Sequence, residues 1–151
     1  MKETEDLYSV IDSIIVCKFS RGTYVKGFDD LAALYTAVTG IEMSGEGLRL
    51  AGERINNLGR LINIREGLTR KDDSLPWKVM HVPIPDEGPS KGSHVSQEEL
   101  DLLLDDYYEV RGWNKEGIPT LEKLKELDME DLAYIVKDKP ETRKKHAKTE
   151  E

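Results

Sequence analysis

The chain has 151 residues, of which 38% are hydrophobic and 34% charged, and it carries a formal net charge of -8. This composition is typical of a soluble globular domain and excludes an intrinsically disordered chain, which carries fewer apolar residues. The negative charge argues against nucleic acid as the main partner, because an acidic protein is repelled by phosphate backbones. No stretch reaches the ~18 apolar residues of a membrane span, and the acidic start lacks the basic region of a secretory signal. We therefore expect a cytoplasmic protein with no membrane contact.

The first predicted helix covers residues 5–19. Its apolar positions occupy more than half of the helix circumference, so we expect deep burial. The end of this run, IIVCKF, could by itself form a buried strand, but the helical period begins earlier and favours a helix. The pattern ends near Gly22, which can terminate a helix. The apolar residues at helical spacing are Leu7, Val10, Ile11, Ile14 and Ile15.

A second helix is predicted over residues 28–38, with Asp29 or Asp30 as N-cap and Gly40 as the stop. A third, the longest, is predicted over residues 45–66 behind the candidate N-cap Ser44. Its expected buried stripe consists of Leu48, Ala51, Ile55, Leu58 and Ile62.

Two glycines, Gly52 and Gly59, interrupt the third predicted helix. Each costs roughly 1 kcal/mol relative to alanine inside a helix. Their spacing of seven residues favours a close approach of another helix, and simple tolerance of glycine is the alternative.

Residues 67–95 are interrupted by prolines and glycines and predict one long irregular loop, which in a compact domain is usually functional or packs across another surface. The charged stretch at residues 65–73 is either a solvated, salt-bridged loop or a loop that docks on another domain. The apolar residues expected to pack this segment down are Trp77, Val79, Met80, Val82 and Ile84.

The fourth main helix is predicted to begin at Ser96, which forms a capping-box pattern with Glu99, and to end at Gly112. Thr120 is predicted to cap a short helix over residues 121–127, and a last helix follows within residues 127–136. The expected buried face of the fourth helix consists of Leu100, Leu103, Leu104, Tyr107 and Tyr108.

The predicted fold is therefore all-α, with about six helices around one core and one long irregular loop. We expect a helical domain over residues 1–137 and a flexible charged tail over residues 138–151.

Cys17 is the single cysteine, so the chain can form neither an internal disulfide nor a CxxC metal site. It is either a buried cysteine that acts as a small hydrophobe or one ligand of an iron–sulfur cluster whose other thiolates come from elsewhere. Asp12 is either on the exposed side of its helix or hydrogen-bonded to a polar ligand. On a continuous helix the two residues would point ~140° apart. If both touch one cofactor, the helix must stop or bend between them.

The three histidines match no zinc-site spacing, and we interpret them as ordinary polar residues. No HExxH, GxGxxG, GxSxG or P-loop motif is present.

Five blocks occur along the chain in a distinctive order. They are YSVIDSIIVCKF (8–19), NIREGLTRKDDSLP (63–76), GPSKG (88–92), LDDYYEVRGW (104–113) and GIPTLEKLKEL (117–127). The functionally telling element is the Asp-x-x-x-x-Cys spacing in the first block. In this order the blocks resemble the C-terminal portion of aldehyde ferredoxin oxidoreductases.

The resemblance implies an enzyme that binds a tungstopterin cofactor and one [4Fe–4S] cluster, oxidises aldehydes to carboxylic acids and passes electrons to ferredoxin. By analogy Asp12 would hydrogen-bond a pterin and Cys17 would be one of the four cluster ligands. The family motif is Asp-x-x-Gly-Leu-Cys, and this chain has Ile15 and Val16 at the Gly-Leu positions. Val16, next to Cys17, is included among the cofactor-binding candidates.

The upstream CxxCxxxC element of the family is absent from these residues. We therefore expect no cofactor to bind this chain alone and no catalysis without an N-terminal partner domain or chain. The alternative is a metal-free, stand-alone helical module that covers its apolar surface by forming a homo-oligomer.

Overall fold

The computed structural model describes residues 1–23, 25–85 and 87–137, so the predicted tail over residues 138–151 lies outside the described residues. Within the described ranges the fold is helical, with isolated bridges and no strand, which confirms the predicted all-α class. Three short 3-10 turns cover Lys18–Ser20, Arg70–Asp72 and Glu130–Leu132. The α-helices of the described part are α1 (Lys2–Ser13), α2 (Phe28–Thr39), α3 (Gly45–Arg65), α4 (Trp77–His81), α5 (Gln97–Arg111), α6 (Leu121–Glu126) and α7 (Ala133–Lys137).

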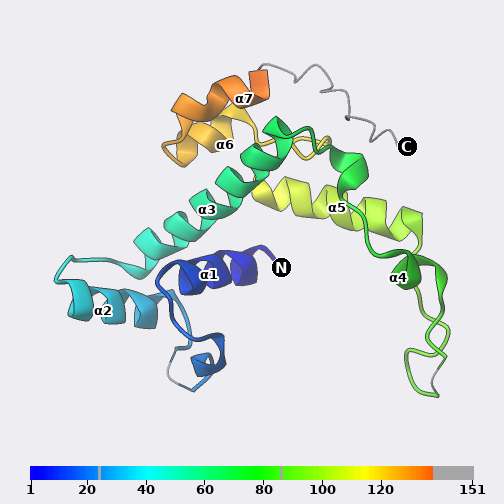
Figure 1. Cartoon of the computed structure of the whole chain (residues 1–151), viewed down its shortest axis with the longest axis horizontal. Coiled ribbons are helices and arrows are strands. Elements are labelled where there is room, and N and C mark those ends of the chain that lie inside the picture. The colour runs from blue at the N-terminus through cyan, green and yellow to red at the C-terminus, as the bar shows by residue number, and fades with distance from the viewer. Residues whose placement is uncertain (24, 86, 138–151) are drawn as a thin grey trace, which may run out of the picture.

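The long helix α3 forms the axis of the molecule (Figure 1). α1 and α2 pack near its first half, α6 and α7 near its end, and α5 lies on the side away from α2. The segment around α4 extends away from the other helices. α3 therefore connects two separate groups of helices.

The interior consists of two apolar clusters, and the prediction of one core was wrong. The first joins α1, α2 and the start of α3, and the second joins the end of α3 to α6 and α7. The first contains Leu7, Val10, Ile11, Val25, Leu31, Ala32 and Leu48, and the second contains Leu61, Ile64, Leu124, Leu127, Met129 and Ile135.

A buried polar layer separates the two clusters. The Arg111 side chain is fully buried and donates hydrogen bonds to Asp6 Oδ1 and Glu5 Oε2, each at a distance of 2.5 Å. Glu53, 2% exposed, is held by Lys2 at 3.0 Å and Lys123 at 3.1 Å. Buried charges of this kind are tolerated only when they are paired. Among the described residues, no buried side-chain nitrogen or oxygen lacks a hydrogen-bond partner.

The polar layer explains why the predicted buried stripe of α3 was wrong beyond its first residues. The inward face of α3 carries Glu53 and the fully buried Asn57. The apolar positions of the stripe point outward instead, with Ile55 39%, Leu58 43% and Ile62 42% exposed.

The two glycines of α3 lie in different surroundings. A Cβ on Gly52 would lie 2.3 Å from the Asp6 carbonyl oxygen, whereas a Cβ on Gly59 would have no neighbour within 4 Å. Gly52 therefore allows the close approach of α1, and nothing within this chain requires Gly59.

Alanine at these two positions is expected to have opposite effects. Gly52→Ala should lower the free energy of unfolding by about 1–3 kcal/mol, because the added methyl group meets backbone that cannot yield locally. Gly59→Ala is the matched control and should raise it by about 1 kcal/mol through helix propensity. Urea denaturation of the two variants checks this, and equal effects would contradict the packing described for α1.

Most predicted helix ends are confirmed. The side chains of Ser44, Ser96 and Thr120 accept hydrogen bonds from backbone N–H groups at the starts of α3, α5 and α6. Gly40 and Gly112 end α2 and α5 in the left-handed conformation that favours glycine.

The predicted first residue of α2, Phe28, is confirmed, but the predicted N-cap, Asp29 or Asp30, was wrong. Its N-cap is Gly27, and the Asp30 carboxylate instead accepts a hydrogen bond from the backbone N–H of Lys26 at 2.7 Å.

The charged loop at residues 65–73 is salt-bridged within the chain. Arg70 donates to Asp105 at 2.5 Å, and Arg60 donates to both carboxylate oxygens of Asp73. Tyr108 also donates to Asp73. Burial alone would raise the pKa of the Asp73 carboxyl, but these hydrogen bonds lower it below its usual range. Burial, together with the bond to Asp73, raises the pKa of Tyr108 to about 12.

Candidate functional site

The candidate site lies where α1 ends. The predicted helix over residues 5–19 was wrong in its second half, because α1 stops at Ser13. Ile15 has a φ of 61°, and its N–H donates to Asp12 O at 3.3 Å, while the Val16 N–H donates to Ile11 O at 3.0 Å. This pair of bonds is the Schellman arrangement that closes many helices, with isoleucine at the position where glycine is usual.

The bend satisfies the geometric demand made from the sequence. Cys17 follows the turn in extended backbone and is exposed. Its exposure contradicts the interpretation of a buried cysteine within this chain. Asp12 is also exposed, and the turn returns the chain toward it, since Lys18 Nζ lies 3.0 Å from Asp12 Oδ2.

Basic and aromatic side chains surround this turn. Lys18 Nζ lies 5.2 Å from the centre of the Tyr8 ring, and Arg21 Cζ lies 4.8 Å from it. Tyr8 and Asp12 are one helical turn apart on α1 and thus share a face. These cation–π contacts hold the segment after Cys17 against the end of α1.

The third candidate, Val16, has a mainly structural environment. Its side chain packs against the first apolar cluster, whose members include Ile11. Contact of this kind between the residue after the left-handed position and the helix commonly accompanies the Schellman turn. Ile15 and Phe19, which lie two positions before and after Cys17 in the sequence, are 91% and 96% exposed. Cys17 is thus flanked by apolar side chains that the described chain leaves uncovered.

The positive φ of Ile15 is expected to be costly, because a β-branched residue in the left-handed region is strained by about 1–2 kcal/mol. Ile15→Gly should therefore raise the free energy of unfolding by about 1 kcal/mol, or the melting temperature by about 2–4 °C. The control is Ile14→Gly, where φ is -92° and the side chain packs on the first cluster. This variant should be less stable than the unaltered chain in a thermal melt. A lower melting temperature for Ile15→Gly would contradict the turn described here.

The metal-ligating side chains of the chain indicate which cofactors it can help to hold. A [4Fe–4S] cluster needs four thiolates, and the chain has Cys17 alone. No group of three or more metal-ligating side chains occurs among the described residues. Cys17 therefore fits one ligand of such a cluster, whose other three thiolates this sequence does not contain.

Sequence reasoning missed Tyr8 and Arg21 as neighbours of this site. The signal that was available is the four-residue spacing of Tyr8 and Asp12, which places both on one face of α1. The close return of Lys18 and Arg21 depends on the turn at Ile15, and an isoleucine gives no sign of such a turn.

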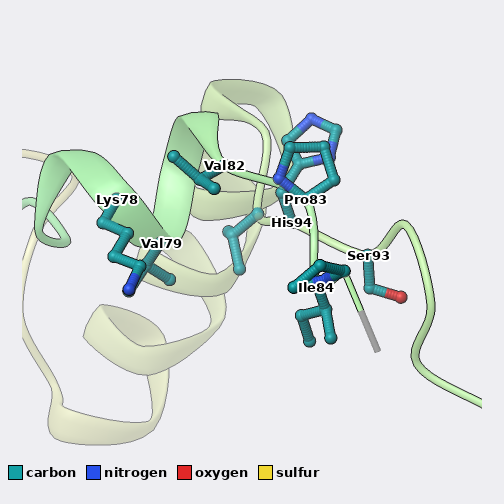
Figure 2. A pocket seen from close by; sticks show the side chains of 9 residues that line it. Lys78, Val79, Val82, Pro83, Ile84, Ser93 and His94 are labelled. Carbon is teal, nitrogen blue, oxygen red and sulfur yellow. The ribbon is translucent and has the colours of Figure 1, made fainter. Parts of the chain in front are cut away.

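A pocket lies in the segment that contains α4. Residues 79–85 and 87–95 lie against each other, with Ile84 N–H donating to Ser93 O at 3.0 Å and Val95 N–H donating to Val79 O at 3.2 Å. The resulting pocket has a volume of about 370 Å³. Figure 2 shows the side chains that line it, such as Val79, Val82 and Ile84. The prediction that the apolar residues of this segment pack down was wrong for this chain, because Trp77 is 68% exposed and these three are each about 40% exposed.

None of the described helices combines the length and apolar character needed to cross a membrane.

Comparison with known proteins identifies what this helical unit is part of. Residues 1–129 match the family model described as aldehyde ferredoxin oxidoreductase, domains 2 and 3. The chain is 40% identical over 129 residues to the tungsten-containing aldehyde ferredoxin oxidoreductase of Pyrococcus abyssi, covering 85% of this chain and 20% of that protein. It is 31% identical over 132 residues to the aliphatic sulfonate oxidoreductase, WOR-like subunit, of Pyrococcus furiosus.

A solved structure agrees with these relatives. A chain of the active-site complex BamBC of benzoyl coenzyme A reductase with 1,5-dienoyl-CoA superposes with a TM-score of 0.71 and 28% identity, over 90% of this chain and 20% of that one. The fold and these matches define a helical unit that corresponds to domains 2 and 3 of this enzyme family. The chain belongs to the aldehyde ferredoxin oxidoreductase family. It spans about a fifth of the length of the relatives named here.

Proposed function

We propose that this chain is the cofactor-covering C-terminal part of an aldehyde:ferredoxin oxidoreductase and is active only with its N-terminal tungstopterin-binding part. The reaction converts an aldehyde and water into a carboxylic acid, two protons and two electrons, and ferredoxin accepts the electrons one at a time. The observation that carries the proposal is the exposed Cys17, presented by the turn that ends α1 in a chain of this family.

Each site residue has a separate role in this proposal. Cys17 supplies one thiolate to the [4Fe–4S] cluster, and three thiolates come from the N-terminal part. Asp12 orients a pterin by accepting a hydrogen bond, and Lys18, which pairs with Asp12, keeps this carboxylate close to the turn. Val16 anchors the turn through its packing on the first cluster. When bound, the tungstopterin supplies the redox chemistry at the aldehyde carbon.

The exposed apolar surface supports a covering role. More large apolar side chains are exposed than are buried among the described residues, and a soluble protein rarely leaves large apolar patches uncovered. The outward stripe of α3, formed by Ile55, Leu58 and Ile62, has the exposed Gly59 in its middle. A glycine there lets another helix approach closely. The pocket beside α4 in Figure 2 adds a second apolar surface.

The test is to coexpress this chain with the remainder of the Pyrococcus abyssi relative, as a separate tagged chain that lacks the matched region. We refer to this pair as the assembly. The expected result is copurification of the two chains with tungsten and iron. The assembly should also oxidise aldehydes, with a viologen dye as the electron acceptor. Each chain expressed alone is the control and should show no aldehyde oxidation.

The same experiment distinguishes the stand-alone alternative. A self-associating module would elute as a metal-free homo-oligomer whether or not the second chain is present. That result would contradict the proposed function.

A further inference from the structure

The segment around Cys17 differs in charge from the rest of the molecule. Residues 13–28 contain Lys18, Arg21 and Lys26 and no acidic residue. With the chain at -8 and this segment at +3, the remaining residues carry -11 (-8 minus +3). A basic segment on an acidic protein creates a local field that attracts a negatively charged partner.

The fold places these cations next to the candidate cluster ligand. Lys18 directly follows Cys17, so their Cα atoms are about 3.8 Å apart. Lys18 and Arg21 both lie against the Tyr8 ring, at 5.2 and 4.8 Å. Their stacking on Tyr8 keeps both cations at the end of α1 from which Cys17 emerges. Lys26 is exposed as well, and its backbone N–H is tied to Asp30.

An exposed aromatic residue lies among these cations. Phe19 is 96% exposed, immediately after Lys18. Exposed aromatic residues are enriched where proteins meet, and charged residues commonly form the rim of such contacts. Short-lived encounters between electron-transfer proteins bury little surface, at the low end of interface sizes. The four exposed side chains of Lys18, Phe19, Arg21 and Lys26 suit a contact of that size.

We propose that the exposed side chains of Lys18, Phe19, Arg21 and Lys26 form the docking surface for an acidic one-electron carrier protein of the ferredoxin class. The inference rests on the proposed function, in which Cys17 ligates the cluster that delivers electrons. Electron transfer slows steeply with distance, so the carrier must dock beside a cluster ligand. The basic segment raises the rate of encounter with an acidic carrier, and Phe19 provides the apolar centre of the contact.

An anionic group of the bound cofactor is the competing partner for these cations. The exposed Phe19 favours a protein partner, because a phenyl ring gains nothing from facing a phosphate but is stabilised by burial against another protein. The two partners predict different kinetics, so one experiment separates them.

The test is the charge reversal Lys26→Glu in the metal-loaded assembly. Lys18 and Arg21 are left unchanged, because both lie on the Tyr8 ring and hold the segment after Cys17 in place. Aldehyde oxidation is measured with an acidic ferredoxin and, separately, with a dicationic viologen dye. The control is Lys125→Glu on α6, another exposed lysine, distant in sequence from Cys17.

The expected result is that KM for ferredoxin rises about tenfold, since electrostatic steering changes association rates by roughly 10–1000-fold. KM for the viologen should stay the same or fall, because the new carboxylate attracts a dication. Tungsten and iron contents should match those of the unaltered assembly, and Lys125→Glu should change neither KM. In the unaltered assembly, added salt should raise KM for ferredoxin.

Two results would overturn the inference. An unchanged KM for ferredoxin would show that the acceptor docks elsewhere. Loss of metal together with both activities would show that the cations serve cofactor binding or assembly. If the unaltered assembly has no viologen-linked activity, the proposed function fails and this inference fails with it.

Discussion

Replacing Arg111 with methionine is expected to lower the free energy of unfolding by about 3 kcal/mol, at the lower end of the range for breaking a buried ion pair. The guanidinium is fully buried and holds both Asp6 and Glu5. Without it, the buried Asp6 carboxylate keeps only Lys2 and Asn56 as partners, at 3.0 and 2.8 Å. Those remaining contacts keep the expected loss near 3 kcal/mol.

The control for this prediction is Arg65→Met on α3. The Arg65 side chain is 58% exposed and that of its partner Glu66 is 50% exposed. Exposed ion pairs contribute about 0–1 kcal/mol, so this variant should unfold at nearly the same urea concentration as the unaltered chain. An equally small loss for Arg111→Met would show that the polar layer does not stabilise the fold.

Cys17→Ala in the assembly is expected to remove most of the iron and abolish electron transfer to both acceptors. The physical reason is that the cluster would lose one of its four thiolates. The Cys17 side chain is exposed in this chain, so its removal should leave the melting temperature of the isolated chain nearly unchanged.

Ser13→Ala provides the matched control for the cysteine variant. Ser13 is also exposed and lies four residues before Cys17. Among the described residues, its hydroxyl donates one hydrogen bond, to the Ser9 carbonyl oxygen. It should retain iron and activity. Full iron content in the Cys17→Ala assembly would contradict the assignment of Cys17 as a ligand.

Helix caps and helix ends could be predicted from the sequence where the residue type suits its position in the helix. Ser44, Ser96 and Thr120 cap helices because their short side chains reach backbone N–H groups within the same turn. Gly40 and Gly112 end helices because glycine adopts a positive φ without strain. These features depend on neighbours in the chain and need no knowledge of the packing.

The packing of α3 could not be predicted in the same way. Hydrophobic periodicity assigns apolar side chains to the interior, but the interior face of α3 carries Glu53 and Asn57. Their partners lie far away in sequence, as with Lys123 and Trp113. A charge that is buried by a distant partner gives the same local pattern as a charge in water.

For the candidate site, the sequence predicted that the helix must break between Asp12 and Cys17 if both contact one cofactor, but it did not predict the structure of the break. The angle between Asp12 and Cys17 on a continuous helix required a break, and the break is present at Ile15. Isoleucine disfavours the conformation it adopts there, so no local rule would place the turn. The family resemblance contributed the glycine at this position, which is the residue that the backbone geometry favours.

The central claim is that the Cys17 side chain is exposed to solvent in this chain and becomes buried when the N-terminal part is present. Alkylation with iodoacetamide, followed by mass spectrometry of the Cys17 peptide, measures this directly. We predict rapid alkylation in the isolated chain and protection in the metal-loaded assembly. Equal alkylation in both, or no alkylation of the isolated chain, would contradict the account.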